Sequence, residues 1–363
     1  MNKKLMAVAV AGALAAPAVA FAQASSVQIY GRANLGFDSA EAKGATAANS
    51  DHKRRNRVFD SSSRLGFQGT ENLGMGLKAV FKIETGVNMD NGSNTGQNGG
   101  VNGATGYLAS REGWAGLAGN WGQVLFGKQN VWWTNLVDQT QANYINVGVQ
   151  FATGGFGIMG APTVRTNNTV KYISPTMGGF TGFLSYAPGS ESAPANAETD
   201  DNVTGATLTY RGPLLAQFDW AKNEVGTTET TGTKLGIGWP YRPGAILSAI
   251  FIQLKSEAGG AETKQDGWQL NWSHMFGNLQ GMAQYGQTKD INGTDNTGTK
   301  GWLVAAKYHL SKRTGVYASY TQLKNDSGQR ADYSGGAMGV AAPGTLALGA
   351  DPKIFAVGIQ HNF

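Results

Sequence analysis

Few side chains in this sequence are suited to catalysis. There is no cysteine, which excludes disulfide scaffolds, thiolate metal sites and thiol nucleophiles. Of the four histidines, His52 falls in a predicted loop, His274 and His309 lie near predicted turns, and His361 shares an apolar face. A serine hydrolase needs a serine within reach of a histidine, and no histidine here is flanked by a nucleophile motif. We therefore expect no enzyme, no metal site and no cofactor.

The remaining chemistry is electrostatic, because charged residues recur at positions that alternate with apolar ones. Arg64, for example, has the opposite parity to Leu65 and Phe67. Successive side chains of a strand point to opposite faces, so this alternation predicts one apolar face and one face in water. The residues predicted to line that wet face are Arg32, Arg64, Lys78, Lys82, Glu84, Arg165 and Lys171.

The elements that would position these residues are strands, and the last nine residues show the pattern best. Phe355, Val357, Ile359, His361 and Phe363 share one face, while small and polar residues occupy the other. Similar stripes run through residues 216–220, 268–272 and 302–308. One strand, 109–118, resists assignment because Trp114 and Leu117 have opposite parity. An apolar face and a polar face fit a sheet that separates lipid from a water-filled lumen.

Connections between the strands alternate in length. Short turns are predicted near 71–76, 119–122, 175–179, 211–213, 241–244, 276–278 and 311–314, and longer loops at 39–56, 87–107, 129–164, 187–202, 222–232, 255–265, 288–299 and 323–352. The segments between them count to sixteen antiparallel strands. Even strand number with short turns at one rim and long loops at the other is typical of a bacterial outer-membrane barrel. Tyr30, Tyr172, Trp239, Trp268 and Tyr308 at strand ends are predicted to form interfacial girdles.

The first residues read as a secretory signal. Lys3 and Lys4 precede an apolar run and two small-residue cleavage sites, after Ala22 or Ala24. We therefore expect a signal peptide at 1–22 and one barrel domain at 23–363. Without Lys3 and Lys4, 27 basic residues face 24 acidic ones, a net charge of about +3 that is too small for a nucleic-acid-binding protein. No apolar run outside the signal is long enough for a helical span.

Longer motifs carry a family resemblance. SRLGFQGTENLGMGLKA at 63–79, with SVQIYG at 26–31, resembles the Gram-negative general porins of the betaproteobacterial, Neisseria-type branch. SREGW at 110–114, LSKRTGVY at 310–317 and the terminal Phe363 agree with it. The resemblance spans the mature chain. It implies an all-β, sixteen-stranded transmembrane barrel, a homotrimer in the outer membrane, a third loop folded into the lumen, and Phe363 as the membrane-assembly signal.

In such a channel the constriction decides which solutes pass. The loop from Gln129 to Val164 is the natural candidate; it holds a single acid, Asp138, and no base. In anion-preferring members of the family a cluster of arginines faces this loop, and the matching positions here are Arg64, Arg111 and Arg165. We therefore predict passive passage of small hydrophilic solutes and ions with a weak anion preference.

Other interpretations stay open. The lumen cations could simply pair with acids on neighbouring strands, as Lys82 with Glu84. Aromatic residues of the third loop, Trp132, Trp133 and Tyr144, would suit a channel that prefers saccharides or organic anions. The basic run 53–57 in the first outer loop is either a solvated surface or a site for lipopolysaccharide phosphates. An exported soluble β protein would leave the lipid-facing stripe unexplained.

Overall fold

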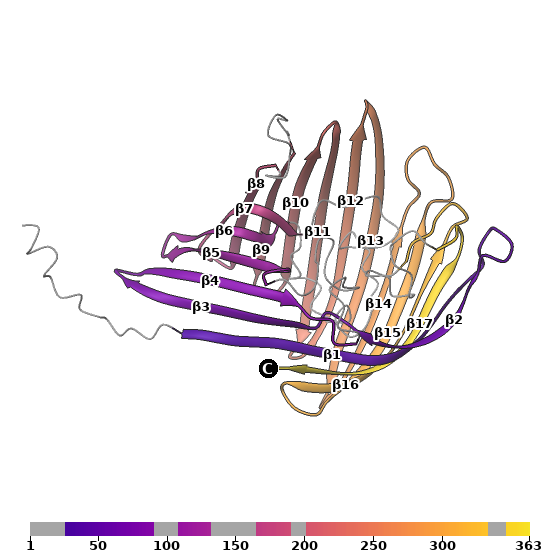
Figure 1. The fold of residues 1–363 in the computed structure, drawn as a ribbon, viewed down its shortest axis with the longest axis horizontal. Helices are drawn as coiled ribbons and strands as arrows, with labels where there is room; N and C mark the ends of the chain where they lie inside the picture. Colours follow the sequence, from indigo (N-terminus) through magenta and orange to yellow (C-terminus); the bar gives the residue numbers. More distant parts are fainter. Residues whose placement is uncertain (1–25, 91–107, 132–164, 190–200, 333–345) are drawn as a thin grey trace, which may run out of the picture.

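The computed structural model describes residues 26–90, 108–131, 165–189, 201–332 and 346–363. They form seventeen strands (Figure 1). The strands are β1 (Ser26–Lys43), β2 (His52–Asp60), β3 (Arg64–Gly74), β4 (Leu77–Gly86), β5 (Glu112–Gly119), β6 (Gly122–Asn130), β7 (Arg165–Ile173), β8 (Phe180–Ala187), β9 (Asn202–Arg211), β10 (Leu215–Val225), β11 (Thr228–Arg242), β12 (Ala245–Ala258), β13 (Ala261–Phe276), β14 (Leu279–Thr288), β15 (Thr299–His309), β16 (Thr314–Asn325) and β17 (Asp351–Asn362).

The strands close into one antiparallel barrel of sixteen positions, as predicted. Consecutive strands pair, except that β2 and β3 both pair with β1 and not with each other, and β17 returns to pair with β1 along most of its length. Figure 1 shows the C-terminus lying beside β1. Pairing of the last strand with the first closes the sheet, so the backbone N–H and C=O groups along the paired strands bond within the sheet and not with lipid.

One barrel position is divided between two strands. β2 pairs with the upper half of β1, from Leu35 to Ala42, and β3 pairs with the lower half, from Ser26 to Arg32. The two pairings are out of register with each other by one residue. In the gap, Ser63 Oγ accepts a hydrogen bond from the Asn34 amide at 2.9 Å, and Asn34 Nδ2 donates to the Ser61 carbonyl at 3.0 Å. Side-chain bonds therefore replace part of the ladder there.

The alternation predicted from the sequence holds around the wall. Trp302, Val304 and Tyr308 are exposed on the outside, while Leu303 between them is fully buried on the inside. The outward positions of the other predicted stripes, Phe218 and Leu270 among them, are also exposed. In β5 the exposed Leu117 faces out, and Trp114 has the opposite parity and donates from Nε1 to Glu112 at 3.3 Å. The face that the sequence left unassigned is thereby settled.

One girdle prediction is wrong. Tyr30 lies on the lumen face of β1, where its hydroxyl donates to Glu84 Oε2 at 2.9 Å. Its parity matches Arg32 rather than Ile29, which is 61% exposed on the outside. The residue type suggested a membrane interface, but the face it occupies depends on parity.

Three predicted loops are largely strand. β1 and β2 extend to Lys43 and His52, so the basic run 53–57 belongs to β2 and not to an outer loop. The stretches 222–232 and 255–265 are hairpins with two-residue turns at Gly226-Thr227 and Gly259-Gly260. All three turn glycines have positive φ, as tight hairpin turns require. Polar composition suggested loops here, but the polar residues pair across strands that continue beyond the membrane.

The inner wall also carries an apolar cluster that the sequence did not predict. Leu303, Leu323 and Ile354 are buried on neighbouring strands, and Leu346 and Ala350 of the last connection join the same cluster. Two hydrogen bonds from Asn325 Nδ2, to the carbonyls of Ala331 and Ala350, hold both described ends of that connection. The described ends of the connection therefore pack onto the inside of the wall.

Several predictions concern residues outside the described ones. They are the signal peptide at 1–22, Asp138 and most of the loop that carries it, and the aromatic residues Trp132, Trp133 and Tyr144. Among the residues described, no helix has the length and mean hydropathy needed to cross a bilayer.

Candidate functional site: a cationic wall in the barrel lumen

Charged side chains gather on the lumen face of one arc of the barrel, from β1 through β7. The pairing register brings them to similar heights. Arg32 lies opposite Arg64, and Glu84 lies opposite Glu112. Two carboxylates directly opposite each other repel unless cations lie between them. The two glutamates therefore indicate where the cations gather.

Glu84 is the centre of the cluster. Its Oε1 accepts from Arg111 Nε at 2.8 Å, and its Oε2 accepts from the Tyr30 hydroxyl. Lys82 Nζ lies 3.6 Å and Arg64 Nε lies 3.9 Å from the same carboxylate. Glu84 is 4% exposed and Arg111 is 7% exposed, so this is a buried, hydrogen-bonded ion pair with further cations around it.

Glu112 takes up the next cation along the wall. Lys82 Nζ donates to its Oε2 at 2.9 Å, and Asn130 Nδ2 donates to its Oε1 at 3.0 Å. Lys82 thus bridges the two glutamates and also lies 5.9 Å from the centre of the Tyr30 ring. This bridging lets two like charges face each other across β4 and β5.

Arg165 and Lys171, both on β7, extend the cluster. The electrostatic neighbours of Arg165 are Arg111, Glu112, Glu84 and Arg64, yet its buried Nε has no hydrogen-bond partner among the described residues. Lys171 Nζ donates to the Asn130 carbonyl at 2.8 Å. No carboxylate of the described residues lies within ion-pair distance of Lys171. These two cations are the least neutralised part of the wall.

The charge balance of the arc is positive. Five cations surround the two carboxylates Glu84 and Glu112: Arg64, Lys82 and Arg111 pair with them directly, and Arg165 and Lys171 feel them only at longer range. Fixed positive charge on a lumen wall concentrates anions and repels cations. The arrangement can therefore bias which ions enter the channel without any bond being made or broken.

The structure places the other predicted lining residues away from this cluster. Arg32 is on the same wall but closer to the C-terminal strand, where its Nε donates to Asn362 Oδ1 at 3.2 Å and Lys307 is an electrostatic neighbour. Lys78 shares the face of Lys82 four residues nearer the short turn and is exposed. A separate buried ion pair, Lys234 to Asp219 at 3.2 Å, lies on β10 and β11.

Sequence reasoning missed three members of the cluster. Tyr30 is predicted at the interface, Glu112 is not among the predicted lining residues, and Trp114 has no assigned face. Glu112 shares the parity of Trp114, so the Leu117 parity could have placed both inside. No group of three histidine or acidic side chains suited to a metal occurs among the described residues.

Comparison with known proteins identifies the fold and the family. The model of the Gram-negative porin family matches residues 7–328. Outer membrane porin protein 32 of Delftia acidovorans is 31% identical, with all of both chains aligned, and an outer membrane porin protein of Bordetella pertussis is 29% identical over 90% of this chain and 95% of its own. The solved structure of the anion-selective porin from Comamonas acidovorans has a TM-score of 0.76, with 26% identity, 93% of this chain and all of that chain covered.

A more distant structure shares the fold. The trimer form of OmpT from Vibrio cholerae has a TM-score of 0.63 at 15% identity, with 94% of this chain and all of that chain covered. The closed sixteen-position barrel, its lipid-facing exterior and the family match over most of the sequence agree. The chain belongs to the Gram-negative porin family of the outer membrane.

Proposed function

We propose that the chain forms a water-filled channel for passive passage of small hydrophilic solutes and ions, with a weak preference for anions. The observation that carries the preference is the excess of cations over carboxylates on the β1–β7 wall. The name of the anion-selective porin from Comamonas acidovorans supports the same sign. Electrostatics alone would suffice, and the channel would catalyse no reaction.

Arg64, Arg111 and Arg165 are the proposed selectivity residues, with Asp138 facing them from the third loop. Arg165 should contribute most per charge, because its Nε has no hydrogen-bond partner among the described residues and because Glu84 neutralises much of Arg111. Arg32, Lys78, Lys82, Glu84 and Lys171 are proposed to line the remaining pore. A purely structural role, in which the cations only pair with acids, applies to Arg111 and Lys82 better than to Arg165.

Reversal potentials in a salt gradient across planar bilayers test the proposal. Arg165→Gln should lower the chloride-to-potassium permeability ratio by about three-fold, because one unit charge near the pore acts oppositely on the two ions and is partly screened by salt. Lys255→Gln, on the outside of the barrel, is the matched control and should leave the ratio unchanged. An unaltered ratio in Arg165→Gln would exclude this arginine from the selectivity filter.

A channel that prefers organic anions is the second candidate, since the lumen wall carries more cations than carboxylates and guanidinium groups bind carboxylates well. Saturable block of chloride current by one dicarboxylate, and not by an uncharged sugar of similar size, would favour it over general diffusion. Block by a sugar alone would instead favour a saccharide channel.

The mature protein is proposed to be residues 23–363, assembled as a homotrimer after removal of a signal peptide. Intact mass measurement of protein extracted from outer membranes tests the cleavage site. A mass that includes residues 1–22 would contradict the proposed signal.

A further inference from the structure

Aromatic rings and lysine ammonium groups alternate around the lumen wall. Lys82 Nζ lies 5.9 Å from the centre of the Tyr30 ring, and Lys171 Nζ lies 5.4 Å from the centre of the Phe183 ring. Phe183 is on the lumen face of β8, because its neighbour Leu184 is 59% exposed on the outside. Both lysines are within the range at which an ammonium group is attracted to a ring face. The wall is therefore aromatic as well as cationic.

Trp114 is a third lumen ring, on β5 between the strands of these two pairs. Its Nε1 donates to Glu112 Oε2 at 3.3 Å, which orients the indole, and the side chain is half-buried. Within the part of the chain that the structure describes, no other ring stacks on Trp114. An indole that is held by its edge and not covered by a neighbouring ring can stack with a flat solute.

Two glycines flank Trp114 in the sheet. Gly127 lies directly opposite it on β6, and Gly116 lies two residues further along β5. A Cβ at Gly127 would come within 2.1 Å of the Gly113 carbonyl oxygen, and a Cβ at Gly116 within 2.0 Å of the Val124 carbonyl oxygen, so neither position admits a side chain. Gly127 also has a φ of 131°, which favours glycine. The wall beside the indole is therefore bare backbone.

Beyond Gly127, β7 carries a cation. Gly127 lies opposite Thr169, and Lys171 is two residues further along the same face of β7. Lys171 Nζ donates one of its three hydrogens to the Asn130 carbonyl at 2.8 Å, and the other two can be donated to a carboxylate. Because β5 and β7 are two strand spacings apart, about 10 Å, Trp114 and Lys171 flank an interval that fits one aryl ring with its carboxylate.

We propose that Trp114 and Lys171 form a site in the lumen for aromatic carboxylates, in which the aryl ring stacks on the indole and the carboxylate pairs with the ammonium group. The inference rests on the proposed channel function and names a class of solute for it. Offset stacking between aromatic rings adds to what apolar contact alone supplies. The charge-assisted hydrogen bond from Lys171 orients the solute.

Glu112 does not exclude a carboxylate from this site. Lys82 Nζ donates to it at 2.9 Å and Asn130 Nδ2 at 3.0 Å, so its charge is partly neutralised. Arg165 adds a further cation on β7, the side on which the solute carboxylate lies. A saccharide could stack on the indole but would leave the ammonium group without an anion, and an aliphatic carboxylate would gain less from the ring. The combination therefore favours aromatic anions over both.

Saturable block of chloride current in planar bilayers by benzoate and by cyclohexanecarboxylate tests the proposal. The two anions have equal charge and similar size, and the cyclohexyl ring is the more hydrophobic, so a preference for benzoate reports stacking and not apolar burial. The concentration that halves the current should be about five-fold lower for benzoate. Trp114→Leu should abolish this difference, whereas Trp114→Phe, which keeps a ring, should retain most of it. Lys171→Gln should weaken block by both anions equally.

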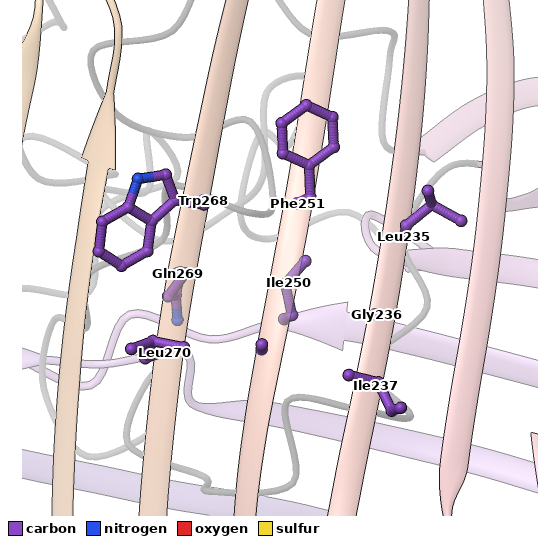
Figure 2. Close-up of a pocket in the computed structure, with 9 residues that line it drawn as sticks. Leu235, Gly236, Ile237, Ile250, Phe251, Trp268, Gln269 and Leu270 are labelled. Atoms are coloured by element: carbon purple, nitrogen blue, oxygen red, sulfur yellow. The ribbon is translucent and has the colours of Figure 1, made fainter.

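The matched control is Trp268→Leu, the same substitution on the outer wall. Figure 2 shows Trp268 with Phe251 and Leu235, which lie side by side on neighbouring strands and line an apolar groove there. Because this ring faces the membrane and not the lumen, its removal should leave the block by both anions unchanged. A loss of the benzoate preference equal to that of Trp114→Leu would overturn the proposal.

Equal block by the two anions in the unsubstituted channel would overturn the proposal without any variant, so it stays testable if Trp114→Leu does not assemble. Retention of the preference in an assembled Trp114→Leu channel, or stronger block by glucose than by benzoate, would also overturn it. Reversal potentials in a salt gradient are recorded from the same preparations. A channel that prefers chloride but does not distinguish the two anions contradicts only this inference, whereas a channel without anion preference contradicts the proposed selectivity.

Discussion

At the scale of single residues, the lumen cluster depends on one carboxylate. Glu84 accepts from Arg111 and Tyr30 and neutralises part of Arg64 and Lys82, while Glu112 directly opposite contacts Lys82, Asn130 and Trp114. Both glutamates oppose the positive field of the wall, but only Glu84 anchors the buried Arg111. Both glutamates should therefore affect ion selectivity, whereas only Glu84 should also affect the stability of the fold.

Substituting each glutamate by glutamine tests this separation. Glu84→Gln and Glu112→Gln should both raise the chloride-to-potassium permeability ratio, because each removes one negative charge from the same wall. Only Glu84→Gln should strongly destabilise the barrel, by about 3 kcal/mol, because it leaves Arg111 buried without its partner. Reversal potentials and thermal unfolding of the purified protein measure the two effects. Equal stability losses would contradict the assignment of Glu84 as the anchor.

Parity was enough to place Arg64, Lys82, Arg165 and Lys171 from the sequence, because a strand has only two faces. Arg111 came from the family resemblance, since the faces of 109–118 could not be assigned. It could not show which cations share a carboxylate, since Arg111 and Glu84 are 27 residues apart and meet only through the pairing of β4 with β5. For Tyr30 the sequence held the needed information, but the prediction did not use it. Its parity could be read from the sequence, but its residue type suggested a girdle and prevailed over the parity.

At the scale of elements, ion pairs stabilise the ends of the tight hairpins β10–β11 and β12–β13, which extend above the membrane. The hydrogen bond from Lys222 lowers the pKa of Glu224, and the one from Lys255 lowers the pKa of Glu257. A carboxyl whose folded pKa is below its unfolded value stabilises the fold above the unfolded pKa, and this contribution is lost as the pH falls through the folded pKa.

We expect acid to loosen these hairpin ends first. As the pH falls below the ordinary glutamate range, backbone amides beside Gly226 and Gly259 should lose protection from hydrogen exchange, after correction for the intrinsic rate. The β13–β14 turn at Gly277 is the control, because none of the salt bridges found among the described residues involves that turn. A uniform loss at both ends of the barrel would instead indicate global unfolding.

The final residue, Phe363, extends the pairing that closes the barrel. Phe363 exchanges two backbone hydrogen bonds with Gly31, at 2.9 and 3.1 Å, and its exposed ring stacks against His361. We propose that Phe363 is the membrane-assembly signal. Phe363→Ala should then reduce trypsin-resistant protein in outer membranes, while Phe355→Ala, also exposed on β17, should reduce it less. Similar yields of both variants would contradict a special role for the terminus.

At the scale of the whole molecule, the sequence was sufficient for the number of barrel positions, the antiparallel order and the orientation of most faces. These depend on a period of two and on turn chemistry, which are local. The loops predicted at 222–232 and 255–265 were wrong, because polar composition does not distinguish a loop from a strand that continues beyond the membrane. The apolar cluster of Leu303, Leu323 and Ile354 was invisible, since inward apolar residues need a partner from a distant connection.

The proposed trimer is also a property of the whole molecule. Light scattering of the detergent-solubilised protein, with the mass of bound detergent subtracted, should give three times the mass of the mature chain. A monomer that still conducts would exclude the trimer without affecting the channel proposal.

The divided barrel position has a consequence for charge placement. Arg57 and Arg64 are seven residues apart, and in an uninterrupted strand an odd spacing would send one of them into the bilayer. The single additional residue between β2 and β3 resets the phase, so that Val58 faces out above the gap and Leu65 faces out below it, while Arg57 bonds the buried Asp38 at 2.9 Å and Arg64 approaches Glu84. Deleting one residue between β2 and β3 would therefore turn one of these two guanidinium groups toward the hydrocarbon of the bilayer.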